Sequence, residues 1–196
     1  ITTRDMIEAH CRLLAELGAK EIAAVVGYSY GGYLTFQWGV TYPDRMRSLV
    51  AVATGITGRG DESTVHELEQ HFEAAAGWNG GYFYTGGDGV EEALIDFRTN
   101  VLRSYGVDAE LRDRGLATDA VDAELHAQAA KWATGFDANA LIVLRRCATK
   151  FDAKPQVANI AAPLLYVLAT TDNLFGPELG EQTIAHIRTE AGVEAT

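Results

Sequence analysis

The first seventeen residues have the hydrophobic spacing of an amphipathic helix. Thr2 and Asp5 stand three positions apart, as in a capping box, and Gly18 is suited to follow the last helical turn. We therefore predict a helix over residues 1–17 that packs through one face. Its predicted stripe consists of Met6, His10, Leu13, Leu14 and Leu17.

Two short apolar runs follow, and a helical segment separates them. Residues 21–28 and 47–54 are rich in Val, Ala and Leu, which is typical of buried parallel strands, the second of them covered on both faces. Residues 30–41 predict a helix that ends at Tyr42-Pro43-Asp44. Strand, helix and strand at these lengths form a βαβ unit, which is almost always right-handed.

The middle of the chain has a mostly helical pattern, which begins after a loop at residues 55–60. Spacing and turn residues predict helices over residues 90–105, 121–132 and 138–149. Residues 77–84 are rich in glycine and aromatic residues. That segment either packs within the helical region or lines a pocket, and the pattern leaves both open.

The strand pattern returns after Pro155, with a buried strand over residues 163–169 and a helix over residues 178–190. We therefore predict an α/β fold whose mostly parallel sheet is flanked by helices. Its core is discontinuous and comprises residues 1–54 and 151–196, while residues 55–150 form a helical insertion. Ligands of such sheets bind beyond the carboxyl ends of the strands, so we expect the insertion to act as a cap there.

Composition narrows the class of partner. The 196 residues carry a net charge of −11, which argues against nucleic acid or an anionic membrane as a partner. The acidity indicates no substrate preference, and the partner we expect is a small-molecule substrate. No run of about 18 apolar residues and no signal-peptide pattern is present, so we expect a cytoplasmic protein. The histidines lack metal-ligand spacing, so we expect no metal, and Cys11 and Cys147 are expected to pack as small apolar residues.

The first apolar run ends in Gly27-Tyr28-Ser29-Tyr30-Gly31, a Gly-x-Ser-x-Gly motif that a helix follows at once. This order is the signature of a nucleophile elbow, in which a strained turn exposes the serine hydroxyl. Ser29 is the candidate nucleophile, and the Tyr30 amide is the candidate oxyanion donor. Gly27 and Gly31 would let strand and helix approach closely. The alternative is a glycine-rich loop without catalytic function.

A serine nucleophile needs a base, and the base needs an acid that orients it. Asp172 follows the strand at 163–169 and is the favoured candidate acid; the alternative is an Asp that binds local amides in a turn. Asp152 competes but follows a helix. His186 is the only histidine after Asp172 and lies within a predicted helix, so we expect the catalytic histidine outside this chain.

Several motifs resemble the homoserine O-acetyltransferase family of α/β-hydrolase-fold enzymes. The resemblance implies an inserted helical cap and a ping-pong acyl transfer through an acyl-enzyme on Ser29. It implies no bound cofactor, with acetyl-CoA as a possible acyl-donor substrate. The motifs are Thr3-Arg4-Asp5-Met6, Gly31-Gly32, Trp38, Tyr42-Pro43-Asp44-Arg45, Phe136-Asp137-Ala138-Asn139, Phe151-Asp152-Ala153 and Asp172-Asn173-Leu174-Phe175.

The chain departs from that family at the substrate site. Members usually carry Ala-Arg early in the cap, where this chain has Ala93-Leu94, and Arg98 one turn further is a candidate replacement. Tyr28 and Tyr30 stand where smaller residues are usual, and Tyr28 is a candidate substrate contact. Three functions stay open: an ester hydrolase or O-acetyltransferase acting on a small alcohol or ester, homoserine O-acetyltransferase itself, and an inactive binding protein of this fold. A homodimer through the cap is a further expectation.

We also expect the sheet to be incomplete. The strands and loop that would supply a second oxyanion donor are expected upstream of Ile1, which itself is not the usual initiating Met. A sheet that begins at the strand before the elbow exposes an edge and a core face. We therefore expect these residues to be stable only with further chain segments or a partner.

Overall fold

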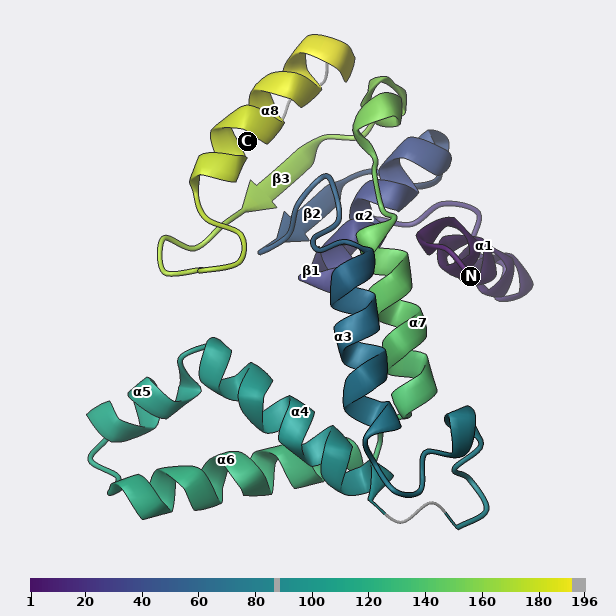
Figure 1. Cartoon of the computed structure of the whole chain (residues 1–196). Coiled ribbons are helices and arrows are strands. Elements are labelled where there is room, and N and C mark those ends of the chain that lie inside the picture. The colour runs from purple at the N-terminus through teal and green to yellow at the C-terminus, as the bar shows by residue number, and fades with distance from the viewer. Residues whose placement is uncertain (87–88, 192–196) are drawn as a thin grey trace. The chain divides into compact units, whose positions relative to one another are not determined.

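The computed structural model describes residues 1–86 and 89–191 and divides into two compact units (Figure 1). The first unit combines Ile1–Asp61 with Cys147–Thr196, and the second is Glu62–Arg146. Within the described ranges, no helix is both long enough and apolar enough to cross a membrane.

The first unit contains a three-stranded parallel sheet in the order β1-β2-β3. Tyr28 pairs with Val52, and Val52 with Val167, so the three strands end at the same level. The predicted strand, helix and strand are confirmed as β1, α2 and β2. The elements of this unit are α1 (Thr3–Glu16), β1 (Val25–Tyr28), α2 (Tyr30–Thr41), η1 (Pro43–Arg45), β2 (Leu49–Val52), η3 (Lys154–Asn159), β3 (Leu164–Val167) and α8 (Glu178–Ala191).

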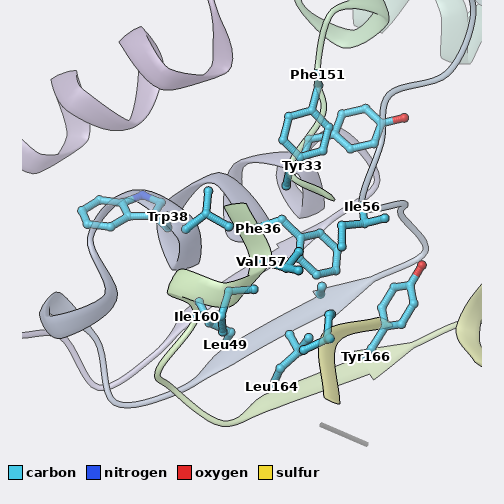
Figure 2. Packing of buried hydrophobic residues seen from close by; sticks show 14 of the residues in the cluster. Tyr33, Phe36, Trp38, Leu49, Ile56, Phe151, Val157, Ile160, Leu164 and Tyr166 are labelled. Carbon is cyan, nitrogen blue, oxygen red and sulfur yellow. The ribbon is translucent and has the colours of Figure 1, made fainter. Parts of the chain in front are cut away.

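One face of this sheet carries the core of the first unit. Leu49 and Leu164 point from neighbouring strands toward Phe36 of α2, and all three side chains are almost fully buried (Figure 2). Val157 of η3 and Ile160, which follows η3, close the same cluster. Because α2 is apolar around most of its circumference, it is buried against the sheet on one side and against α1 on another.

The opposite face of the sheet is exposed in the part of the chain that the structure describes. Val26 and Tyr28 of β1 are 67% and 76% exposed, and Leu165 and Val167 of β3 are 47% and 40% exposed. The prediction of buried strands is therefore wrong for this face. The strands carry apolar side chains on both faces of the sheet. The described helices that pack on the sheet cover only the face to which Leu49 points.

Helix α1 begins with the predicted capping box: the Thr2 hydroxyl accepts from the Asp5 amide, and the Asp5 carboxylate accepts from the Thr2 amide. The Thr2 amide, and then the Thr2 hydroxyl, donate to the Asp5 carboxylate and lower the pKa of the carboxyl. The predicted stripe is wrong, because Leu13 and Leu17 are exposed. The buried residues of the helix are instead Thr3 and Ile7, with Cys11 and Leu14 partly buried behind them.

The second unit is helical and has its own core. Helices α4 and α6 pack along each other, and Leu94, Val121 and Leu125 are buried in the same cluster. The predicted helices over residues 90–105, 121–132 and 138–149 are confirmed. The elements are α3 (Glu62–Glu73), η2 (Asn79–Gly81), α4 (Val90–Ser104), α5 (Val107–Asp113), α6 (Thr118–Ala133) and α7 (Ala138–Thr149), which ends in the first unit.

The aromatic segment at residues 77–84 packs within the second unit. Trp78 is buried and stacks between Phe72 and Phe83, with ring centroids 5.6 and 5.5 Å away. Phe83 stacks in turn on Tyr84 at 4.5 Å. Residues 87–88 of the predicted insertion lie outside the described residues, as do residues 192–196 of the predicted core. Whether the second unit acts as a cap stays a prediction.

Candidate active site

Ser29 occupies a strained turn between β1 and α2. Its φ of 51° and ψ of −119° lie in a region that side-chain-bearing residues rarely adopt. Two backbone bonds hold the turn: the Ser29 amide donates to Val52 O at 2.9 Å, and the Gly32 amide donates to Ser29 O at 2.9 Å. This strand–turn–helix geometry is that of a nucleophile elbow. A strained backbone of this kind persists only where the contacts around it hold it in that conformation.

Gly27 makes the turn possible. A Cβ on Gly27 would lie 2.1 Å from Gly31 O and 2.6 Å from Thr35 Oγ1, which no side chain tolerates. At Gly31 a Cβ would meet nothing within 4 Å beyond its own helix, so the close approach expected there is absent. Gly32 has that role instead, because its Cβ would lie 2.3 Å from a methyl carbon of Thr54.

Tyr30 is the first residue of α2, so its amide is among those that a helix leaves without an intrahelical acceptor. Its side chain is half-buried, with the hydroxyl 3.7 Å from Met6 Sδ and the ring edge-on to Tyr33 at 5.8 Å. Burial, and then the neighbouring Cys147 thiol, raise the pKa of the Tyr30 phenol. The phenol is therefore a neutral packing group, and only the backbone of Tyr30 suits the predicted oxyanion role.

Asp172 lies in the loop after β3, at the carboxyl edge of the sheet where Ser29 also lies. Two strand spacings separate the axes of β1 and β3, which is about 10 Å. Asp172 Oδ1 accepts from the amides of Leu174 at 2.7 Å and Phe175 at 3.0 Å. The expected turn contacts thus form, and they fix the carboxylate at the edge that also carries the candidate nucleophile.

The competitor Asp152 is exposed and lies between α7 and η3. Its Oδ1 accepts from the Lys154 amide at 2.9 Å, and its backbone forms an isolated antiparallel bridge with Thr57. It does not follow a strand of the sheet, which leaves Asp172 as the better-placed carboxylate.

His186 lies in the middle of α8, as the pattern predicted. Its Nε2 is buried, with no hydrogen-bond partner among the described residues. The ring lines a cavity together with Thr57, Arg59 and Lys154, and Ser29 is not among the residues of that cavity. The geometry therefore does not bring His186 together with the candidate nucleophile.

The two candidate substrate contacts lie on different units. Tyr28 extends from the exposed face of β1, next to Val26. Arg98 lies in α4 of the second unit, where its guanidinium stacks over the Trp132 ring at 5.3 Å. This cation–π contact gives Arg98 a packing partner that the sequence did not reveal.

Thr54 is a residue at this edge that the sequence did not single out. It follows β2, between the strands that lead to Ser29 and Asp172, and it is fully buried. Its Oγ1 has no hydrogen-bond partner among the described residues. The neighbouring Ala53 has a φ of 45°, a second strained position at the same edge. Neither feature has a sequence signal, because a threonine after an apolar strand is common.

Among the described residues, no three His, Cys, Asp or Glu side chains are grouped as metal ligands would be.

A family model described as the alpha/beta hydrolase fold matches residues 1–190. The chain belongs to the α/β-hydrolase fold family. In this family the acid follows the nucleophile in sequence, as Asp172 follows Ser29. The predicted α/β-hydrolase fold is thus confirmed.

Comparison with individual α/β-hydrolase proteins confirms the predicted resemblance. The chain is 33% identical to homoserine O-acetyltransferase of Rhodopseudomonas palustris over 78% of this chain and 42% of that protein. It is 30% identical to homoserine O-acetyltransferase of Symbiobacterium thermophilum over 98% of this chain and 56% of that protein. The chain spans about half the length of the curated relatives it matches.

A solved structure shows the same fold. The acetylester hydrolase of Corynebacterium glutamicum superposes with a TM-score of 0.81 and 23% identity, over 100% of this chain and 59% of that chain. This likeness concerns the α/β-hydrolase fold alone.

Proposed function

We propose that the protein to which this chain belongs is a serine-dependent acyl-transfer enzyme that works through an acyl-enzyme on Ser29. The observation that carries the proposal is the strained backbone of Ser29 between β1 and α2. That turn presents a hydroxyl at the carboxyl edge of the sheet, beside the first amides of a helix. The family membership and the names of the relatives support the same class of reaction.

In the first half-reaction, Ser29 Oγ attacks the carbonyl carbon of the acyl donor and transfers its proton to the base. The negative charge on the carbonyl oxygen is stabilised by the Tyr30 amide. The bond to the leaving group then breaks, the base returns the proton to that group, and the acyl-enzyme remains. An alcohol or water attacks the acyl-enzyme in the second half-reaction, which regenerates the Ser29 hydroxyl.

Asp172 is proposed to orient the base, in the role that an acid has in Ser-His-Asp triads. The base itself is proposed to be a histidine other than His186. His186 lines a cavity whose lining residues do not include Ser29. The two bonds from the Leu174 and Phe175 amides hold the Asp172 carboxylate in place, as this positioning role requires.

The acyl donor and acceptor are proposed from the relatives. Their names favour an O-acyltransferase, and one relative from Methylibium petroleiphilum is named homoserine O-succinyltransferase. Acetyl-CoA is proposed as the acyl donor from the family resemblance. Leu94 stands where the resembling family usually carries arginine, which favours an acceptor other than homoserine or hydrolysis by water. Hydrolysis is the second candidate because it shares the same acyl-enzyme.

Labelling tests the nucleophile. A fluorophosphonate probe is expected to modify the whole protein at one serine, and Ser29→Ala is expected to abolish the modification. Ser104→Ala is the matched control, because Ser104 is exposed in α4, where its hydroxyl donates to Val101 O. Failure of the intact protein to react, with correct folding, would support the inactive binding protein instead.

Acyl transfer and hydrolysis are separated by the second nucleophile. Free thiol released from acetyl-CoA only when an alcohol such as homoserine is present indicates transfer. Turnover of p-nitrophenyl acetate at the same rate with and without alcohol indicates hydrolysis. Loss of both activities in Ser29→Ala connects either outcome to the proposed nucleophile.

A further inference from the structure

The first unit contains a cavity that the acyl-transfer proposal does not use. It has a volume of about 450 Å³, within the range of small-molecule sites. We call it the Arg59 pocket. Ser29, Tyr30 and Asp172 are not among its lining residues, which include Ile56, Arg59, Lys154, Phe175, Gln182 and His186.

The rim of the Arg59 pocket is positively charged. Arg59 and Lys154 are exposed and reach the pocket from the loop after β2 and from the start of η3. No lining residue is Asp or Glu, although the whole chain carries a net charge of −11. Two cations without a carboxylate in the lining favour an anionic ligand.

The wall from α8 supplies further polar groups. Gln182 and His186 are four residues apart, so their side chains lie on the same face of the helix. His186 Nε2 is buried and has no hydrogen-bond partner among the described residues. Gln182 is exposed, so its side-chain amide can donate a hydrogen bond to a ligand oxygen from this wall.

The remaining walls are apolar and preformed. Ile56 and Phe175 are 4% and 5% exposed, and the Arg59 guanidinium lies 5.4 Å from the centroid of the Phe175 ring. The Asp172 carboxylate holds the wall segment Leu174–Phe175 by accepting both of its amides. The pocket therefore offers an apolar surface next to its cations.

We propose that the Arg59 pocket binds a small organic carboxylate with an apolar body. The carboxylate lies between Arg59 and Lys154 with a hydrogen bond to the α8 wall, and the apolar body covers Phe175 and Ile56. Recognition of both parts distinguishes this ligand from a simple anion and from a neutral alcohol. The proposal depends on the first unit alone and not on the chemistry of Ser29.

Calorimetry on the whole protein tests the pocket with three probes: octanoate, inorganic phosphate and 1-octanol. Octanoate is expected to bind at least about tenfold more tightly than either of the others, because only octanoate has both an anionic and an apolar part. The double variant Arg59→Gln/Lys154→Gln is expected to weaken octanoate binding by about fivefold to tenfold. Arg12→Gln/Arg47→Gln removes the same charge at exposed positions outside the pocket and is expected to have no effect.

Nuclear magnetic resonance locates the bound octanoate. The ring signal of His186, assigned by its loss in His186→Gln, is expected to shift on titration, and the shift is expected to persist in Ser29→Ala. Three results would overturn the proposal: no octanoate binding, binding that the double variant leaves unchanged, or equal affinity for octanoate and either other probe. A lost labelling reaction at Ser29 would overturn the acyl-transfer proposal without affecting these measurements.

Discussion

At the scale of single residues, the elbow shows how a sequence motif and a steric requirement differ. The motif predicts two essential glycines, but only Gly27 faces an atom that excludes a Cβ. Gly31 contributes its carbonyl oxygen, against which Gly27 packs. Gly32 is required by Thr54, a residue more than twenty positions away, which no local pattern reveals.

This difference predicts unequal effects of alanine. Gly27→Ala is expected to lower the free energy of unfolding by about 2–4 kcal/mol, because the new methyl group overlaps backbone that cannot move without breaking the turn. Gly31→Ala is expected to be neutral or stabilising by up to about 1 kcal/mol, since alanine favours the helix. Urea unfolding of both variants measures the difference, and equal destabilisation by the two would contradict it.

At the scale of elements, the period of a pattern is more easily predicted than the face that becomes buried. Helix α1 forms where the spacing predicts, but it packs through Thr3 and Ile7 rather than through Leu13 and Leu17. The strands likewise form as predicted and leave one apolar face exposed. A helix or a strand has several apolar directions, and only the neighbouring elements determine which of them is covered.

The exposed sheet face predicts self-association of the 196-residue chain by itself. Val26 and Leu165 extend from the same face of the sheet, and apolar patches of this kind favour association in water. Sedimentation velocity is expected to show species larger than a monomer as the concentration rises. The variant Val26→Lys/Leu165→Lys is expected to stay monomeric.

Leu13→Lys/Leu17→Lys is the matched control, because it adds the same charge at exposed leucines of α1. The control is expected to associate like the unmodified chain. A chain that is monomeric at every concentration, with a cooperative melt, would contradict the prediction.

At the scale of the whole molecule, the two units have separate hydrophobic cores. Phe36 belongs to the cluster of the first unit and Leu125 to that of the second, and both side chains are fully buried. The change from strand to helix pattern near residue 55 indicated such a division. The boundaries between the two units lie after Asp61 and after Arg146.

Two cores predict two unfolding transitions. Leu125→Ala is expected to destabilise the second unit by about 2–4 kcal/mol and to leave the first unchanged, because a cavity is felt where the side chain packed. Phe36→Ala is expected to do the reverse, by about 3–5 kcal/mol.

Tryptophan fluorescence distinguishes the two transitions. Trp38 lies in the first unit, and Trp78 and Trp132 lie in the second. Trp38→Phe therefore leaves reporters of the second unit, and Trp78→Phe/Trp132→Phe leaves a reporter of the first. If a core variant shifts the unfolding midpoint reported from both units by the same amount, the chain unfolds in a single cooperative transition instead.

The sequence by itself determined the order of strands and helices, the elbow around Ser29 and the placement of Asp172 after a later strand. These features depend on local periodicity and turn chemistry, which neighbouring residues encode. Tertiary structure decided the buried face of α1, the exposed face of the sheet, the need for glycine at Gly32 and the surroundings of His186. Those depend on contacts between residues far apart in the chain, whose packing no local pattern specifies.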